Sequence, residues 1–329
     1  MKKLLHVSTV HGLLDLLDHD WDRLRLFLKK HGFHGVELFT YQGYDNSTVP
    51  RELVAGIHLG YKPMWLDLWR GDLPALLHQF GSEEEIINYY GGTDRQVLID
   101  YYRREFALAK SIGAKYMVFH VAHVELLHTY TWKFTYTDED VMAACAELIN
   151  EVFGDDDAGI MLLLENLWWP GMRLLDYKAT KKFLASISYP RKGIVLDISH
   201  LICTNPSLKN EAEACSYILA SLAALHELKK EIKAIHLNST LPGAYLAADH
   251  SVQIEKLKQA KSLQEKVGLI MPHIQKIDAH QPFCSPEIKK VMAAVQPQYL
   301  VFELLTNSVE ELEEAIVRQN QALLATVKD

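Results

Sequence analysis

GIVLDISH, residues 193–200, sets an apolar run directly before an aspartate and, three residues later, a histidine. An apolar run without a polar face predicts a strand that is covered on both sides, as in a parallel sheet. Asp197 ends the run, and His200 opens the connection that follows. Both are residue types that bind metal ions. This stretch therefore predicts a buried strand whose carboxyl end carries chemistry.

Similar apolar runs recur from one end of the chain to the other. The other seven lie at residues 4–8, 35–39, 53–58, 115–120, 160–165, 232–236 and 299–303. Amphipathic helix patterns separate them, for example at 20–32, 95–113, 210–230 and 285–295, the last with Ser285 as its N-cap and Pro286 at its first position. Strands that alternate with helices predict the α/β class and a parallel sheet. Eight such units predict a single (β/α)₈ TIM barrel over residues 1–329, and the competing open sheet lacks its usual glycine-rich phosphate loop.

Three connections are longer than a plain barrel needs, and each follows a strand. They cover about residues 59–95, 121–137 and 240–277. Loops after the strands of a barrel form its C-terminal face, where active sites lie. The first two are rich in tyrosine and tryptophan, so we expect either a wall that stacks on a bound ring or loops that pack on themselves.

Most of the apolar runs end on a residue type that can bind a metal. These residues are His58, His120, Glu165, Asp197, His236 and Glu303. The strands of a barrel point to one axis at their carboxyl ends, so the six side chains are expected to share one cavity. Several carboxylates in such a place would repel one another without a cation. The pattern therefore predicts a metal site.

Three residues beyond the strand ends extend the set. His200 follows Asp197, and Asp278 and His280 form a D-x-H pair before the last strand. Asp249 and His250 are an alternative pair, but the later one has the order along the chain that the barrel needs. A catalytic zinc uses about three protein ligands. Nine candidates thus suit two or three ions, and mixed imidazole and carboxylate ligands fit Zn, Mn or Fe.

Composition limits the setting and the partners. Lys and Arg number 34 against 42 Asp and Glu, which gives a formal charge of −8. The four cysteines form no CxxC pair, there is no signal-peptide pattern, and no apolar run is long enough to cross a bilayer. We therefore expect a cytoplasmic protein without a membrane partner. The sequence does not predict an oligomeric state.

Several blocks resemble a known family in their residues and their order. They are GFHGVELF, GIHLGY, GAKYMVFH, LLLEN, VLDISH, IHLNS and DAHQP. They are similar to the xylose isomerase-like TIM-barrel superfamily and, within it, to the endonuclease IV (type 2 AP endonuclease) branch. The resemblance implies a trinuclear zinc cluster that cleaves a phosphodiester beside an abasic site. The implied ligands are His58, His120, Glu165, Asp197, His200, His236, Asp278, His280 and Glu303, and Tyr61 falls where the family has a DNA-contacting tyrosine.

The residues around these ligands depart from the family pattern. Val121 and Ala122 stand where the family has Pro-Gly, Ser239 replaces an aspartate, and the basic residues of the long connections form no run. A duplex-binding protein needs a footprint of cations for the phosphates. Nucleic acid is therefore a possible partner that the sequence does not favour over a small phosphoester or sugar.

Three functions follow from the pattern. The first is a multinuclear metal-dependent hydrolase of a phosphodiester or phosphate ester, in which Glu165 bridges ions and orients the nucleophile. The second is a sugar isomerase or epimerase with one ion on Glu165, Asp197, His236 and Glu303, which leaves the other histidines unexplained. The third is a binding protein without turnover. The candidate substrate-binding residues are Tyr61, Trp132 and Trp168.

Overall fold

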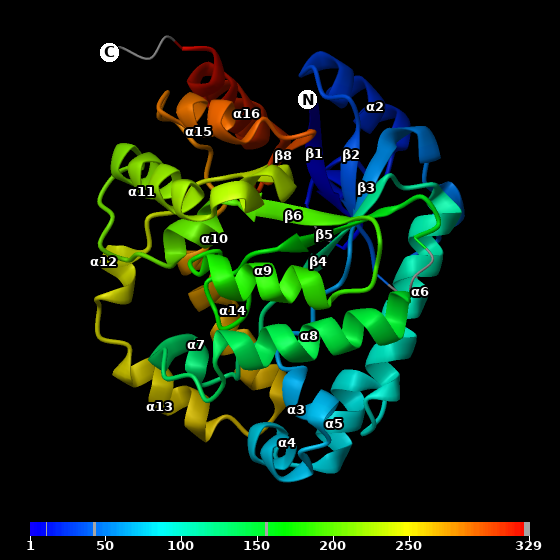
Figure 1. The fold of residues 1–329 in the computed structure, drawn as a ribbon, viewed down its shortest axis with the longest axis vertical. Coiled ribbons are helices and arrows are strands. Elements are labelled where there is room, and N and C mark those ends of the chain that lie inside the picture. Colours follow the sequence, from blue (N-terminus) through cyan, green and yellow to red (C-terminus); the bar gives the residue numbers. More distant parts are fainter. Residues whose placement is uncertain (11, 42–43, 155–156, 326–329) are drawn as a thin grey trace.

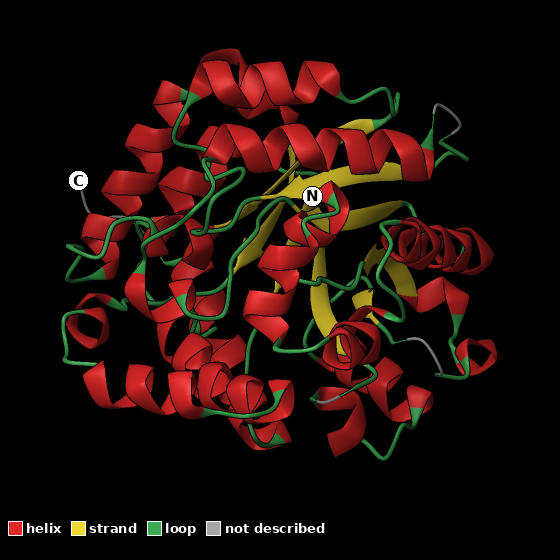
Figure 2. Ribbon diagram, turned by 90° about the horizontal axis from the view of Figure 1, so that it is seen from below, coloured by secondary structure: helices red, strands yellow, loops and turns green. Residues whose placement is uncertain are grey.

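Eight parallel strands close into a barrel in chain order in the computed structural model, which describes residues 1–10, 12–41, 44–154 and 157–325. The predicted TIM barrel is confirmed, and each predicted run contains a strand. Figure 2 shows the strands enclosed by helices. The strands are β1 (Lys2–Ser8), β2 (Val36–Phe39), β3 (Val54–His58), β4 (Tyr116–His120), β5 (Met161–Glu165), β6 (Lys192–Asp197), β7 (Ile232–Leu237) and β8 (Tyr299–Phe302).

Side chains inside the barrel form two layers of opposite character. Alternate residues of a strand face the interior, so one strand can contribute to both layers. The lower layer is a buried apolar cluster of Leu4, Tyr116, Val118, Leu163, Val195, Ala234 and Val301. Two positions beyond Leu4, Val118, Leu163, Val195, Ala234 and Val301 begins a polar upper layer, which includes His6, His120, Glu165, Asp197, His236 and Glu303. The strand register places these residues at the same height in the barrel, since His120 pairs with Glu165 and Asp197 pairs with His236.

The outer helices follow the amphipathic patterns. They are α1 (Leu13–Leu16), α2 (Trp21–Lys30), α6 (Gln96–Ile112), α8 (Asp138–Phe153), α9 (Tyr177–Ser186), α10 (Ile198–Cys203), α11 (Glu211–Ala224), α15 (Ile288–Val295) and α16 (Val309–Leu324), with short 3₁₀ turns at Asn46–Thr48, Arg51–Leu53 and His226–Glu231. Asp20 caps α2 and Thr137 caps α8. The predicted start of α15 at Pro286 was two residues early: its N-cap is Glu287, and the Ser285 hydroxyl accepts the Glu287 N–H instead.

The first and third long connections are largely helical, and the second contains one short helix. They contain α3 (Leu66–Arg70), α4 (Leu73–Phe80) and α5 (Glu83–Tyr90), then α7 (His128–Thr131), then α12 (Gly243–Leu246), α13 (Ser251–Gln259) and α14 (Leu263–Ile277). Most of these helices gather in the lower part of Figure 1. Tyr130 of α7 stacks on His273 of α14 with ring centroids 3.7 Å apart, and Lys266 Nζ donates to the Gln79 carbonyl at 2.9 Å. The connections therefore form one packed wall beside the barrel mouth.

None of the helices in the described part of the chain combines the length and the apolar character that crossing a bilayer requires.

Candidate metal centre

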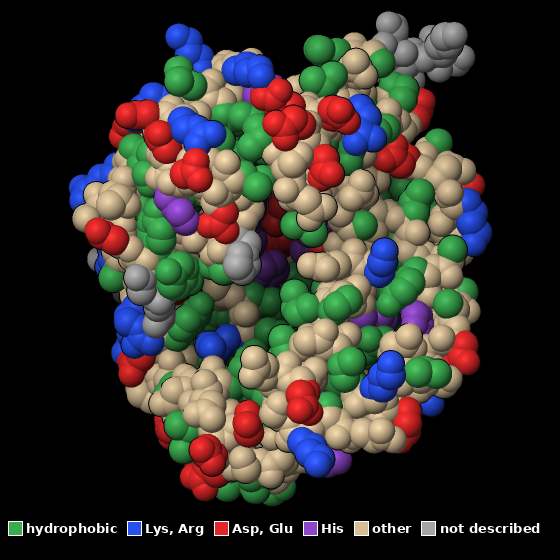
Figure 3. Space-filling view, turned by 180° about the vertical axis from the view of Figure 1, so that it is seen from behind, with side chains coloured by type: hydrophobic (Ala, Val, Ile, Leu, Met, Phe, Trp, Pro, Cys, Tyr) green, Lys and Arg blue, Asp and Glu red, His purple; other side chains and the backbone are tan. Residues whose placement is uncertain are grey.

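The polar upper layer and the segments just beyond it bring all nine predicted ligands together. They form three groups whose possible ligand atoms lie within 4.8 Å of one another in each group. Figure 3 shows a hollow on this face with histidine and acidic side chains at its base. The groups are His58, His120 and Glu165; Glu165, Asp197, His236 and Glu303; and His200, Asp278 and His280.

Glu165 connects two of these groups through its two oxygens. Its Oε2 lies 3.2 Å from His58 Nε2 and 3.3 Å from His120 Nε2. Its Oε1 faces the other way, 3.3 Å from His236 Nδ1 and 3.4 Å from His200 Nδ1. The carboxylate is 1% exposed. This is the arrangement that a carboxylate shared between two ions requires.

The second group is built on the ends of β5 to β8. His236 Nδ1 lies 3.0 Å from Glu303 Oε2 and 3.8 Å from Asp197 Oδ2. Asp197 also accepts the His200 N–H at 2.8 Å as the N-cap of α10, and Asn238 Nδ2 donates to its Oδ2 at 3.1 Å. These hydrogen bonds fix the aspartate between the strand end and the helix.

The third group lies on connecting segments. Both histidines donate Nδ1–H to a backbone carbonyl, His200 to Asn166 at 2.8 Å and His280 to Glu303 at 3.1 Å. Their Nε2 atoms converge on Asp278 Oδ2, at 3.2 Å and 2.8 Å. In proteins, a histidine that binds a metal through one nitrogen commonly holds its other N–H in this way. The pair is therefore oriented with both Nε2 atoms directed at one carboxylate.

Electrostatics supports cations at this centre. Within the described residues, the recorded ion pairs of Glu165, Asp197, Asp278 and Glu303 are all with histidines. Burial raises the pKa of Asp197 to about 6, and the carboxylates around it add to this although His200 opposes it. A buried acidic cluster of this kind is unfavourable unless positive charge enters it.

Unpartnered atoms show where that charge fits. Among the described residues, Glu165 Oε1, Glu303 Oε2 and His236 Nδ1 are buried without a hydrogen-bond partner. The two oxygens nevertheless lie only 3.3 and 3.0 Å from that nitrogen. Buried polar atoms without partners are rare in folded proteins. Their lone pairs converge, which is the geometry of a cation site. The residues thus fit a site for more than one metal ion, while the identity of the metal stays a prediction.

Two further residues of the upper layer belong to the centre, and the strand-end pattern missed both. Glu37 of β2 is fully buried and forms a group with His58 and His236. His6 of β1 lies 3.6 Å from Glu37 and 3.9 Å from Glu303. Burial alone would raise the pKa of Glu37, but the neighbouring histidines lower it to about 2. The sequence nevertheless marks both residues. Each is a titratable side chain inside an apolar run, at a position where the alternation of the strand directs it to the barrel interior.

A cavity of about 310 Å³ opens beside the third group. Its polar side carries His6, Asp278, His280 and Glu303, and its apolar side includes Met271, Ile274 and Leu305. No lysine or arginine of the described chain lines it. Its volume lies at the lower end of the range of small-molecule sites.

Two of the three predicted substrate-binding aromatics, Tyr61 and Trp168, lie against the centre. The Tyr61 ring lies 4.7 Å from His120, and the Trp168 ring lies 5.1 Å from His200, measured between centroids. Trp132 packs in the same apolar cluster. In the part of the chain that the structure describes, Tyr61 Oη and the indole nitrogens of Trp132 and Trp168 are buried without a hydrogen-bond partner. Their role in substrate binding stays a prediction.

Two predictions about other histidines have different outcomes. The alternative pair Asp249 and His250 lies outside the three groups, and His250 Nε2 donates to the Tyr245 carbonyl at 2.9 Å. The position of His123 in the aromatic connection after His120 predicts a solvated loop residue rather than a substrate-binding one. The side chain is instead 2% exposed, and its Nδ1 accepts the Leu66 N–H at 3.3 Å. The expectation was wrong because the connections pack on each other as helices.

Solved structures with the same fold include both hydrolases and epimerases. A D-tagatose 3-epimerase-like protein matches with a TM-score of 0.55 and 13% identity over 98% of this chain and 97% of its own. Endonuclease IV from Thermus thermophilus matches with 0.53 and 14% over 98% and 99%. The 3-keto-D-glucoside 4-epimerase from E. coli matches with 0.50 and 14% over 98% of each chain. At these identities the matches show the fold alone.

A search of curated proteins gave no significant match. The model of the xylose isomerase-like TIM barrel family, however, matches residues 26–256, which is more than half of the chain. The match spans the strands β2 to β7 and most ligands of the three groups. The chain belongs to the xylose isomerase-like TIM barrel family.

Proposed function

We propose that this protein is a metal-dependent hydrolase of phosphoesters, of the endonuclease IV-like type, with up to three zinc ions. The third group carries the proposal. A single ion would be satisfied by Glu165, Asp197, His236 and Glu303, yet His200, Asp278 and His280 are oriented as a separate set beside them. An enzyme that uses one ion has no need of that set.

Bound ions would activate water and neutralise the charge of the phosphoryl oxygens and the leaving group. The chain supplies the positions. Glu165 lies between the groups with one oxygen on each side, so it is the residue best placed to orient the attacking water. Ser199 Oγ lies 3.0 Å from Asp197 Oδ1 and 2.5 Å from Asp278 Oδ1, so its single O–H can donate to either carboxylate and the hydroxyl spaces the second and third groups.

A small phosphoester is the substrate class that the surroundings favour. The cavity beside the third group is small and, among the described residues, lined without lysine or arginine, so few protein cations would meet a long phosphate backbone. Tyr61 and Trp168 offer ring faces beside the centre, and Trp132 packs in the same apolar cluster as both. Within the described chain each of the three carries a buried donor without a partner. We propose that they bind the organic part of the substrate.

The test is hydrolysis of bis(p-nitrophenyl) phosphate and of a duplex with one abasic site by zinc-loaded protein. We expect turnover of the small diester, and a loss of about 100-fold in His280→Ala. The matched control is His250→Ala, because this histidine lies outside the three groups, and it should keep full activity. Absence of turnover of both substrates by protein with a full metal content would contradict the proposal.

A second function, epimerisation of a sugar, is favoured by one observation. Glu165, Asp197, His236 and Glu303 form a complete four-ligand group without help from the others. In that reaction one carboxylate would move a proton while a single ion such as Mn holds the sugar oxygens. Turnover of ketoses by manganese-loaded protein, unchanged in His280→Ala, would replace the first proposal by this one.

A further inference from the structure

Four histidines of the centre hold the ring nitrogen that faces away from the ligand groups in a hydrogen bond, but one of them uses a different nitrogen from the others. His58, His200 and His280 hold Nδ1 on a backbone carbonyl, at 3.2, 2.8 and 3.1 Å. Their Nε2 atoms then face Glu165 or Asp278. His236 is reversed, because its Nδ1 faces Glu165 and Glu303. Its outer nitrogen therefore needs a different partner.

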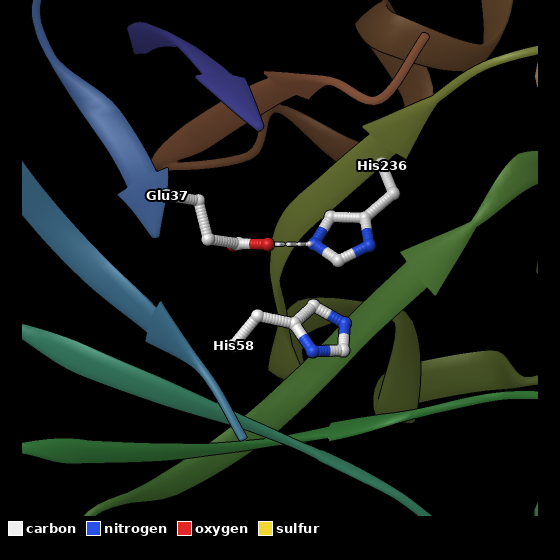
Figure 4. A group of neighbouring side chains, drawn as sticks. All are labelled: Glu37, His58 and His236. Atoms are coloured by element: carbon white, nitrogen blue, oxygen red, sulfur yellow. Dashed lines mark hydrogen bonds and ion pairs between the residues drawn. The ribbon is translucent and has the colours of Figure 1, made fainter. Parts of the chain in front are cut away.

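Glu37 is that partner. His236 Nε2 lies 3.0 Å from Glu37 Oε1 and 3.2 Å from Oε2, and both side chains are fully buried (Figure 4). A carboxylate can only accept here, so Nε2 carries the proton and the lone pair of the neutral ring is on Nδ1. Nδ1 is the atom that lies among Glu303, Glu165 and Asp197. Glu37 therefore lies on the opposite side of the His236 ring from those three carboxylates.

The carboxylate is itself held by the barrel floor. The Tyr116 hydroxyl donates to Glu37 Oε2 at 2.8 Å. The Tyr116 ring is fully buried and reaches across β3 at Gly56, where an added Cβ would lie 2.2 Å from its Cζ. On the other side the ring contacts Tyr299 with centroids 4.5 Å apart. This packing restricts the Tyr116 ring, and the ring in turn restricts the hydroxyl that holds Glu37.

We propose that Glu37, held by Tyr116, is a positioning residue that orients His236 and fixes Nδ1 as its metal-binding nitrogen. Glu37 does for His236 what backbone carbonyls do for the other three histidines. The inference rests on the metal centre of the proposed function, but it holds for hydrolysis and epimerisation alike. Loss of such an outer partner commonly lowers metal affinity by about 10–100-fold.

The test is zinc affinity by chelator competition, and zinc content at saturation, in Glu37→Gln and Tyr116→Phe. We expect Glu37→Gln to weaken the affinity by about 10–100-fold and Tyr116→Phe by less, with unchanged ions per chain at saturation. Glu37→Asp should recover part of the affinity. Long-range ¹H–¹⁵N spectra of the zinc-loaded wild type should show His236 protonated on Nε2.

The matched control is Glu105→Gln, since Glu105 is another buried carboxylate, 2% exposed, that accepts the Gly60 N–H and belongs to none of the three groups. It should bind zinc as the wild type does. Unchanged affinity in Glu37→Gln would overturn the inference. Fewer ions per chain at saturation would also overturn it, because Glu37 would then be a ligand. Full zinc binding without phosphoester cleavage would contradict the proposed function alone.

Discussion

The second and third groups of the centre both combine carboxylate and imidazole ligands but are held in different ways. Glu165, Asp197 and His236 are on strands, in register with their neighbours, and are 0–1% exposed. Asp278 and His280 lie between α14 and β8, where the side chains are 8% and 20% exposed, and His280 has a φ of 47°. Barrel geometry fixes the first set, whereas local hydrogen bonds fix the second.

The difference shows which part of the site a barrel provides without further adaptation. Strand ends converge in any barrel of this kind, so four ligands for one ion need only the right residues at four positions. The third group needs a helix start at Asp197, a left-handed residue at His280 and carbonyls aimed at both rings. Residues held in this way can be removed with little effect on the barrel.

The largest effect is expected where the groups meet. Glu165→Gln should lower zinc affinity by more than the about 100-fold of an outer-partner substitution and should remove activity, because one carboxylate serves two groups. Chelator competition and turnover of the diester measure both losses. The variant would contradict the shared role of Glu165 if it lost only one ion and kept the rest at wild-type affinity.

Next comes the loss of the third group alone. Asp278→Asn should reduce hydrolysis by about 100-fold, since both His200 and His280 direct Nε2 at this carboxylate. The thermal unfolding temperature of the zinc-free protein should change little, because the segment lies outside the barrel wall. A large fall in that temperature would show that the third group is structural.

A smaller effect is expected between the groups. Ser199→Ala removes a hydroxyl that contacts Asp197 and Asp278 at once. The lost hydrogen bond is worth about 1 kcal/mol, so we expect zinc affinity to fall by about tenfold or less. Calorimetric titration with zinc measures it, and an unchanged titration would show that the two groups are positioned independently.

The substitution Glu105→Gln is expected to leave the metal centre unchanged and to change the stability of the fold in a pH-dependent way. Burial raises its pKa from 4.5 to about 7, so the folded state holds the proton more tightly than the unfolded chain. This carboxyl therefore favours folding below pH 4.5, and that contribution is lost as the pH rises through 7. Glu105→Gln should increase the free energy of unfolding at pH 8 by at most about 3 kcal/mol and leave it unchanged near pH 4. Urea unfolding at the two pH values measures this difference. An equal change in the free energy of unfolding at both values would exclude titration of Glu105 as its cause.

The barrel and the nine ligands could be predicted because both depend on short-range patterns. An apolar run that ends on His58, Asp197 or His236 carries its position in the sequence, and closure of the barrel brings such ends together. Glu37 escaped the prediction because it lies within its run, where only the inward alternation marks it. The packing of the long connections depends on contacts between distant segments, such as Tyr130 on His273, that no local pattern contains.

The substrate could not be predicted for the same reason. The cavity takes its walls from β1, from α14 and from the segment after β8, which are far apart in the sequence. The metal-binding residue types limit the chemistry, while the shape that selects a substrate is a property of those walls.

The most direct test is the zinc content of natively purified protein, measured by elemental analysis beside His280→Ala. Three groups in one centre predict more than one zinc per chain and up to three, with one fewer in the variant. A single ion per chain that His280→Ala leaves in place would contradict a multinuclear centre. It would leave only the group of Glu165, Asp197, His236 and Glu303 as a metal site.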